Sequence, residues 1–257
     1  QWLPLHLMDI QTMKIIMRTF LEVFPNAYLF LGNYDVKGMV IGLVGCEKPL
    51  RFDRDHFANH FSDPKLSAFL TTIRYTEPLD FFHYFMAETD ALRNYVGEGP
   101  LNTDNRPIVT WKAPAVSAYN NHKDGGPKLR LKRFIEDLYR LRADTLGFVV
   151  DNPGNRPDDF SDSKILSLVK ARDLFLLGGI EAEISSWNNC AELFLQALSL
   201  YPDFDLAYYN LLEMCKRAYR AYPRPVRTWL TGLIKVCPRR TEAQQLYGKL
   251  FFPGGAH

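Results

Sequence analysis

The residues whose spacing comes nearest to a metal site are His56 and His60, in the segment His-Phe-Ala-Asn-His. Two histidines four residues apart lie on one face of a helix, where they can bind zinc. The metalloprotease pattern requires glutamate where Phe57 stands, and no third ligand is evident although Asp55 and Asp63 are near. We therefore interpret the two histidines as partly exposed residues and predict no metal site.

Other catalytic patterns are also missing from the sequence. No GxSxG, P-loop or Cys–His motif occurs, and the acidic run at 158–162 lacks the spacing and the terminal glutamate of an EF-hand loop. The glycine pairs at 125–126 and 178–179 do not follow a strand, so neither predicts a glycine-rich nucleotide loop. We predict no cofactor and assign no catalytic residue.

Composition excludes several classes of partner. The formal net charge of +2 gives no reason to expect nucleic acid or an anionic membrane as a ligand. No run of eighteen apolar residues and no signal-peptide pattern occurs, so we expect no membrane insertion by this chain. The four cysteines form no CxxC pair, which favours buried free thiols in a reducing compartment.

The N-terminal third predicts a helix followed by two strands. Asp9 is a suitable N-cap, and apolar residues recur at spacings of three and four from Ile10 to Phe24. Residues 27–31 and 39–45 are continuous apolar runs on either side of a turn, which is typical of strands buried on both faces. Two strands are too few to stand alone, so an exposed edge near 27–31 or 39–44 would invite pairing with another chain.

Further along, the pattern alternates between helices and polar turns. Residues 50–96 are predicted to be largely helical, and 97–107 form a long polar turn. Residues 108–111, Ile-Val-Thr-Trp, are predicted to form a short strand. Residues 115–127 contain two asparagines and a Gly-Gly-Pro run, and are predicted to be a linker.

The C-terminal part contains an internal repeat. The segment LSLYP ends at Pro202 and is followed by Ala207, and IKVCP ends at Pro238 and is followed by Ala243; each residue is 36 positions from its counterpart. This pattern resembles the tetratricopeptide repeat, whose period is about 34 residues. In that family a proline ends one helix, and a small residue lets the next helix pack closely. The alternative interpretation is an ordinary helical bundle.

A stacked helical array would present a surface for a protein partner. Aromatic residues are the side chains that most often anchor such interfaces, although about half of those in this region are expected to be core residues instead. The candidate anchors are Tyr208, Tyr209, Tyr219, Tyr222 and Trp229.

Three separated motifs in the first half resemble the bacterial spermidine-synthase-like domains related to polyamine aminopropyltransferases. They are QWLPL at 1–5, RTFLEVFP at 18–25, and GPLNTDNRP at 99–107, followed by Ala-Pro at 113–114. The resemblance covers residues 1–114, and Asn105 replaces the second aspartate of the third motif. It implies a methyltransferase-like, Rossmann-type sheet whose glycine loop, ribose-binding carboxylate and catalytic aspartate lie on strands that this chain does not encode.

The resemblance also implies a small set of substrate-contacting positions. Gln1 matches the glutamine that follows the fifth strand of the family, near the amine site. Tyr34 falls in the hairpin loop where related synthases carry a pocket tyrosine, although the following proline is missing here. Asn102, Thr103 and Asp104 would cap the pocket. The alternative interpretations are an exposed loop tyrosine and ordinary turn residues.

Together these patterns predict a helix-dominated α+β protein. A partial Rossmann-like β-α-β-β remnant over 1–114 is followed by the linker at 115–127 and an all-α, tetratricopeptide-like region over 128–252. The function predicted is a non-catalytic part of a spermidine-synthase-like protein that binds a protein partner, either cytoplasmic or at the cytoplasmic face of a membrane if the parent protein carries upstream spans. The alternative is the tail of an intact enzyme that transfers an aminopropyl group from decarboxylated S-adenosylmethionine to a diamine.

Overall fold

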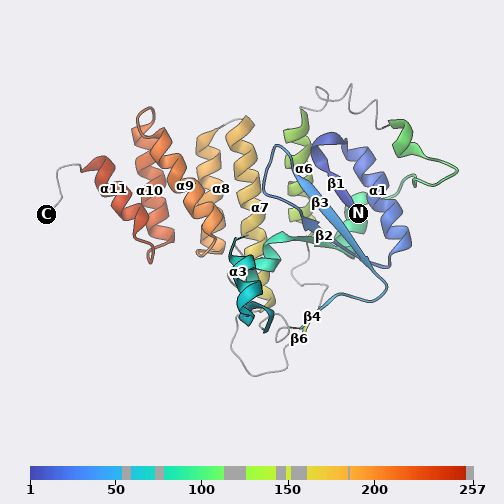
Figure 1. Ribbon diagram of the computed structural model, residues 1–257. Helices are drawn as coiled ribbons and strands as arrows, with labels where there is room; N and C mark the ends of the chain where they lie inside the picture. Colours follow the sequence, from blue (N-terminus) through green and yellow to red (C-terminus); the bar gives the residue numbers. More distant parts are fainter. Residues whose placement is uncertain are drawn as a thin grey trace. The chain divides into compact units, whose positions relative to one another are not determined.

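The computed structural model describes residues 1–53, 59–72, 78–112, 126–142, 149–151, 161–184 and 186–252. The chain divides into two compact units, Gln1–Val169 and Lys170–His257 (Figure 1). Helices dominate and accompany a small antiparallel sheet, which confirms the predicted α+β class.

The first unit contains both sheets and most of the short elements. Its elements are β1 (Trp2–Pro4), η1 (Leu5–Leu7), α1 (Ile10–Val23), β2 (Asn26–Leu31), β3 (Val40–Cys46), β4 (Arg51–Asp53), α3 (Pro64–Thr72), η2 (Pro78–Tyr84), β5 (Phe85–Glu88), α4 (Thr89–Val96), α6 (Gly126–Leu141) and β6 (Val149–Asp151). The second unit consists of α8 (Trp187–Leu200), α9 (Asp205–Ala218), α10 (Pro223–Val236) and α11 (Glu242–Phe251), together with the C-terminal part of α7 (Asp162–Ile184).

The larger sheet has the strand order β1-β3-β2-β5, and all three pairings are antiparallel. Leu3 lies opposite Ile41, and Leu29 lies opposite Leu43. The two predicted strands are therefore the interior strands, each paired on both sides. The prediction of an exposed edge near 27–31 or 39–44 was wrong, because β1 and β5 cover those edges.

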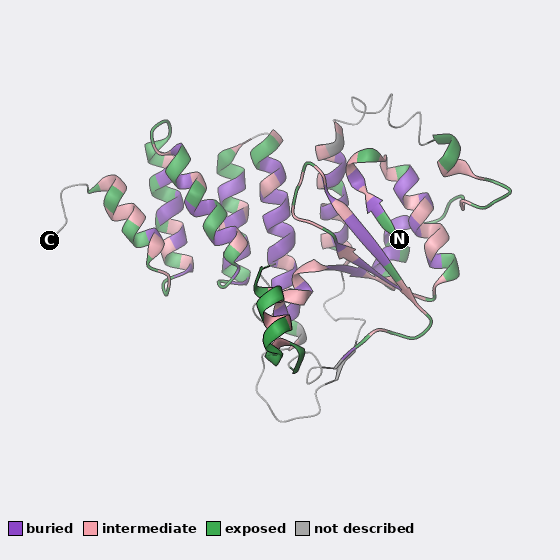
Figure 2. Cartoon of the chain, in the orientation of Figure 1, coloured by how far each residue is buried: buried purple, intermediate pink, exposed green. Residues whose placement is uncertain are grey.

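Helix α1 begins where the sequence predicted, because the Asp9 side chain accepts a hydrogen bond from the Thr12 N–H (2.6 Å). Its apolar face carries Met13, Met17 and Leu21, all buried. Helices α1 and α4 pack against β2 and against each other, and α6 packs on α4 and η1. Figure 2 shows the buried sides of these helices turned toward the sheet.

An aromatic cluster also packs on β2. Phe30 of β2 contacts Phe81 of η2, with ring centroids 5.7 Å apart, and Phe52 of β4 contacts Phe81 and Phe82 at 5.2 and 5.3 Å. Strand β4 pairs in parallel with β6, a pairing that the sequence pattern did not predict. Short strands of this kind are set by a distant partner rather than by local periodicity.

The strand predicted at 108–111 was wrong, because residues 108–112 are helical. Pro107 presets the backbone for a first helical turn, and the Asn102 side chain accepts a hydrogen bond from the Val109 N–H (2.9 Å). The cap thus comes from a residue outside the local β-propensity pattern. Of the predicted linker, residues 115–125 lie outside the described residues, as do Ala113 and Pro114, while 126 and 127 open α6.

Helix α6 belongs to the first unit. Phe134, Ile135 and Leu138 are buried, and the Phe134 ring meets Tyr95 of α4 edge-on at 5.4 Å. The apolar stripe of this helix is therefore used against α4 and η1, within the unit that contains the sheets.

In the second unit, helices α8 to α11 alternate in direction and stack side by side (Figure 1). Ala207 and Ala243 are completely buried, as expected for small residues at close helix contacts. Gly178 of α7 and Gly232 of α10 lie against α8: a Cβ atom on Gly178 would stand 2.6 Å from the Phe194 ring, and one on Gly232 would stand 2.8 Å from Leu195. Small residues therefore set the spacing of this stack.

Candidate functional site

Gln1 and Tyr34, two of the positions suggested by the resemblance, are engaged in local contacts. The Gln1 ammonium group donates to the Leu43 carbonyl (2.9 Å), and its side chain donates to the Trp2 carbonyl (2.9 Å). The Tyr34 hydroxyl donates to the His83 carbonyl (3.2 Å). Both residues therefore help to hold strand β1 and the β2–β3 loop in place.

The turn residues Asn102 and Thr103 also have structural contacts. The Asn102 N–H donates to the Thr19 hydroxyl (2.8 Å), and its side chain caps the turn at 108–112. Thr103 and Arg106 exchange backbone hydrogen bonds in a tight turn, and Asp104 stands exposed at the tip of that turn. These contacts match the turn interpretation of the three residues.

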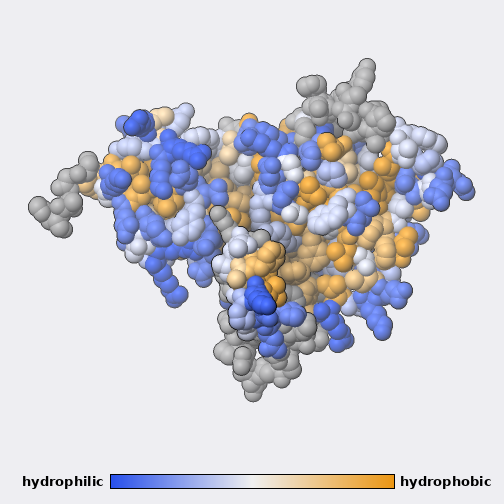
Figure 3. Space-filling view, viewed as in Figure 1, coloured by the Kyte–Doolittle hydropathy of each residue, from blue (hydrophilic) through white to orange (hydrophobic). Residues whose placement is uncertain are grey.

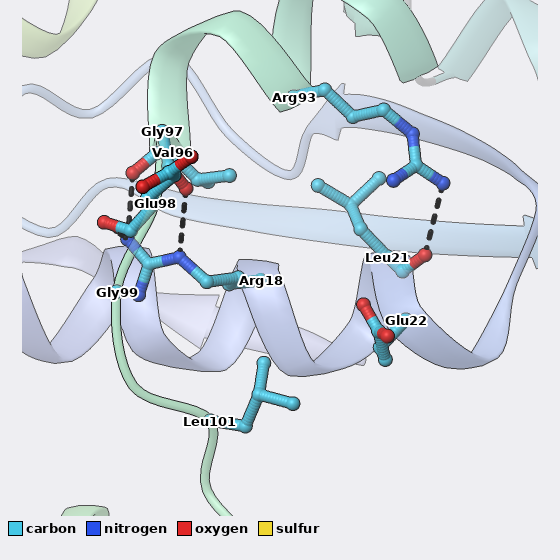
Figure 4. A pocket seen from close by; sticks show the side chains of 9 residues that line it. All are labelled: Arg18, Leu21, Glu22, Arg93, Val96, Gly97, Glu98, Gly99 and Leu101. Atoms are coloured by element: carbon cyan, nitrogen blue, oxygen red, sulfur yellow. Dashed lines mark hydrogen bonds between the residues drawn. The ribbon is translucent and has the colours of Figure 1, made fainter.

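Arg18 of α1 binds the segment after α4 through backbone carbonyls alone (Figure 4). Its guanidinium donates to four oxygens: Val96 (2.6 Å), Gly97 (2.9 Å), Pro100 (3.0 Å) and Glu98 (3.2 Å). We call this arrangement the Arg18 clamp. It joins two of the motifs that carry the resemblance, because Arg18 and Thr19 belong to one motif and Pro100 and Asn102 belong to another.

The glycines in this segment make the Arg18 clamp possible. Gly97 adopts φ +58°, a conformation that L side chains rarely adopt. A Cβ atom on Gly99 would stand 2.7 Å from the Arg18 guanidinium. The backbone can therefore approach the arginine only without a side chain at this position.

A hollow of about 500 Å³ lies beside the Arg18 clamp, between α1 and the end of α4. Its second arginine, Arg93, donates to the Leu21 carbonyl (3.2 Å), so it too is committed to the backbone. The remaining polar side chains are the carboxylates of Glu22 and Glu98. Because both cations of this hollow already hold the fold, its geometry favours a structural role over a ligand site.

In the second unit, Tyr208 and Tyr209 belong to a closed polar cluster where α9 begins. Tyr208 is buried; its hydroxyl accepts from the Ala243 N–H (3.1 Å) and donates to Glu242 (3.3 Å). Tyr209 is half-exposed and donates to the same carboxylate (3.2 Å). Arg240 lies over the Tyr208 ring, 4.4 Å from its centroid, and binds Asp205 (2.7 Å). The cluster fixes the start of α11.

Tyr219 is likewise engaged inside the second unit. Its hydroxyl donates to the Leu250 carbonyl (2.6 Å), and its ring meets Phe251 edge-on at 5.3 Å. This predicted anchor ties α9 to α11 and is only partly exposed.

The other two predicted anchors, Tyr222 and Trp229, line one cleft of about 430 Å³. They are joined there by Trp187, which the sequence analysis missed, and the Trp187 and Tyr222 rings are 6.3 Å apart. Trp187 is 40% exposed and Tyr222 55%, whereas Trp229 is only 6% exposed. We call this the aromatic cleft; its other lining residues are Ser186, Asn188 and Pro225.

The first turns of α8 and α10 position the aromatic cleft. Ser186 caps α8 by accepting from the Asn188 N–H (3.1 Å), which places Trp187 at the first helical position. Helix α10 starts with Pro223 and Pro225, which fix its first turn directly after Tyr222. A tryptophan directly after a serine cap was the signal in the sequence that could have identified Trp187 as exposed.

Charge is distributed unevenly around the aromatic cleft. Residues 214–241 contain eight lysines and arginines and no aspartate or glutamate. Lys216 and Arg217 pair with Glu213, and Arg240 pairs with Asp205. On the face shown in Figure 3, hydrophilic side chains cover much of the helical stack, including the end that carries the α9–α10 connection. The whole-chain charge of +2 conceals this local excess.

Cys190, Cys215 and Cys237 are buried free thiols, as predicted, and Cys46 is half-buried. Burial raises the pKa of Cys190 and of Cys215 to about 12, so these thiols are poor nucleophiles. Within the described ranges no group of three metal-binding side chains occurs, and His56 lies outside them. No described helix combines the length and apolarity needed to cross a membrane.

Comparison with known proteins adds no assignment. No protein-family model, curated protein or solved structure matches this chain.

Proposed function

We propose that this chain is a non-catalytic part of a spermidine-synthase-like protein and that its second unit binds a protein partner through the aromatic cleft. The observation that carries the proposal is the pair of exposed rings, Trp187 and Tyr222, above the buried Trp229. Tryptophan and tyrosine in a partly desolvated pocket are the side chains that most often dominate interface energy.

The helical stack supports the binding role. The two segments of the internal repeat end α8 and α10, where Pro202 and Pro238 follow, and the matching alanines are completely buried in α9 and α11. This agrees with a tetratricopeptide-like array, in which stacked helix pairs form an extended surface for partners. The proposal assigns that partner-binding surface to the end where α8 and α10 begin.

Contacts within the first unit support the family resemblance. Two of the three motifs contact each other through the Arg18–Pro100 bond of the Arg18 clamp and through Thr19 and Asn102. The order of helix and antiparallel hairpin also agrees with the C-terminal part of the family sheet. The positions carried over from the family hold the fold, which favours a non-catalytic role for this chain.

The compartment is part of the proposal. Buried free thiols fit a reducing compartment such as the cytoplasm, or the cytoplasmic face of a membrane if the parent protein has upstream spans.

The test begins with a photo-crosslinking amino acid at position 222 of the full chain. The captured protein is identified, purified and titrated against the chain by calorimetry. We expect Trp187→Ala and Tyr222→Ala each to weaken binding by about tenfold or more. The control is Tyr209→Ala, which removes a half-exposed ring that does not line the cleft and should change the affinity by less than about threefold. Equal affinity of all variants would overturn the proposal.

The alternative function is the tail of an aminopropyltransferase-like enzyme, and the outer edge of β1 favours it. Strand β1 pairs only with β3 among the described residues, and Trp2 is 67% exposed beside that edge. In such an enzyme, further strands would pair with β1; a second copy of the chain is the other occupant to consider. Calorimetric titration with methylthioadenosine distinguishes the two functions, since micromolar binding supports the enzyme and no heat supports the binding role.

A further inference from the structure

The aromatic cleft lies beside cations that have no acidic partner in the described part of the chain. Arg220 and Arg224 stand two residues to either side of Tyr222, and both are exposed. Lys235 and Arg239 are also exposed, at the other end of α10 and just beyond it. Arg227 also has no acidic partner in these residues, although its guanidinium donates to the neutral Tyr247 hydroxyl (3.0 Å).

Carboxylates pair with three other basic residues of the same stretch, although one carboxylate serves two of them. Glu213 binds both Lys216 and Arg217, and Asp205 binds Arg240. Arg220 and Arg224, which flank Tyr222 in the sequence, therefore carry positive charge that no carboxylate in the described residues offsets. Exposed charges of one sign attract a ligand of the opposite sign over about one Debye length, roughly 8 Å at physiological salt.

The start of α10 adds slightly to this positive potential. Tyr222 is the N-cap and provides no side-chain cap, but Arg224 alone among the first three helical positions has a backbone N–H, so the contribution of the helix end is small. The positive end of the helix dipole has no acidic side chain in its first turn. This feature slightly reinforces the two arginines at the position of the exposed Tyr222 ring.

We infer that the aromatic cleft binds an extended acidic segment of the partner protein. An aromatic residue or a proline of that segment lies between Trp187 and Tyr222, and carboxylates on either side of it bind Arg220 and Arg224. This inference rests on the proposed function and names the chemistry of the partner.

The dimensions favour a peptide over a nucleic acid. Helix α10 has 14 residues, so it is about 21 Å long, which an extended peptide of about seven residues spans. Strong nucleic-acid binding depends on neutralising many phosphates, about six to ten in well-studied cases. Arg220, Arg224 and Arg227, together with Lys235 and Arg239, supply at most five such contacts, which is fewer than that.

The test measures fluorescence anisotropy of a labelled peptide of about ten residues, made of glutamate and aspartate around a central Phe-Pro pair. Two comparison probes are the same peptide with lysine at every acidic position and an oligothymidine of similar length. We expect the acidic peptide to bind best and its affinity to fall with rising salt.

The variants separate specific from general attraction. Arg220→Glu with Arg224→Glu should weaken acidic-peptide binding by about tenfold or more, since two attractions become repulsions. Lys112→Glu with Arg133→Glu makes the same change of charge on exposed residues of the first unit, and should weaken binding by less than about threefold. Circular dichroism verifies that each variant is folded.

Each contrary outcome has a definite meaning. Tighter binding of oligothymidine, equal binding of the lysine peptide, or equal loss in both double variants would overturn the inference. If no peptide binds while the reconstituted partner still requires Tyr222, the acidic ligand is wrong and the proposed function stands. If the acidic peptide binds through Arg220 and Arg224 while the partner is indifferent to Tyr222 and Trp187, the proposed function fails instead.

Discussion

Replacing Arg18 by alanine is the sharpest test of the first unit. The substitution removes all four hydrogen bonds of the Arg18 clamp and leaves the carbonyls of residues 96–98 and Pro100 without their donor. We expect the segment after α4 to detach from α1, because no other side chain holds these four oxygens in the described residues.

The expected loss of stability follows from how exposed each of the four hydrogen bonds is. The bond to Val96 is partly buried and should contribute about 1 kcal/mol, whereas the three exposed bonds should contribute about 0.5 kcal/mol each. Arg18→Ala should therefore lower the free energy of unfolding by about 2–3 kcal/mol. Arg18→Lys keeps the charge but loses the planar fork, so its cost should be intermediate.

The assay is urea denaturation of the full chain followed by circular dichroism, together with hydrogen exchange of residues 96–107. The control is Arg133→Ala, which removes an exposed arginine of α6 and should change stability by less than about 0.5 kcal/mol. A double-mutant cycle adds Gly99→Ala, whose Cβ clashes with the Arg18 guanidinium. Its cost should be smaller in the Arg18→Ala background.

An Arg18→Ala protein with wild-type stability and unchanged hydrogen exchange at residues 96–107 would show that the Arg18 clamp does not hold this segment. Equal costs of Gly99→Ala in both backgrounds would also count against the Arg18 clamp. That result would mean that the glycine serves the backbone conformation alone.

Three further outcomes are expected in the second unit. Tyr208→Phe should cost about 1 kcal/mol and speed hydrogen exchange at the start of α11, because the Ala243 N–H loses its acceptor; unchanged exchange would contradict this. Gly178→Ala should lower the free energy of unfolding by about 1–3 kcal/mol in urea melts, because the new Cβ meets the rigid Phe194 ring. This loss should outweigh the better helix propensity of alanine. A stabilised variant would show that α8 can shift. The stabilisation from the neutral thiols of Cys190 and Cys215 should be fully present below about pH 9, because their pKa values are raised in the folded state. As the pH rises toward 12, the free energy of unfolding should fall by up to about 1.4 kcal/mol per pH unit for each thiol. Cys190→Ala should make this decline less steep in urea melts from pH 7 to 11.

Local patterns predicted the elements that local chemistry determines. Helix α1 has both an N-cap and a regular apolar spacing, and it begins after Asp9 as expected. The apolar runs that became β2 and β3 were also recognised. Their neighbours in the sheet were not, because strand pairing depends on residues far away in the sequence, such as Leu3 and Phe85.

The error at 108–112 has the same origin. The β-branched residues Ile108, Val109 and Thr110 favour a strand by propensity. A proline before them and the side chain of Asn102 cap a helical turn instead. A non-local hydrogen bond thus outweighed a local preference worth only a fraction of a kcal/mol per residue.

Sequence reasoning found part of the candidate site. Tyr222 and Trp229 were predicted as anchors and line the aromatic cleft, while Tyr208 and Tyr219 were grouped with them although their hydroxyls hold α11. Aromatic identity alone does not distinguish an anchor from a core residue, since both roles use the same side chains. Trp187 was missed because its exposure depends on a helix cap rather than on apolar spacing.

The two prolines that open α10 limit how that helix can move. A helix adds turns at its start only if the residues already there can serve as interior positions, and proline cannot, because its ring collides with the carbonyl four residues earlier. Pro223 and Pro225 therefore act as a stop against sliding by one turn. A ligand between Trp187 and Tyr222 therefore meets a site whose position along α10 is fixed, because the start of this helix cannot shift.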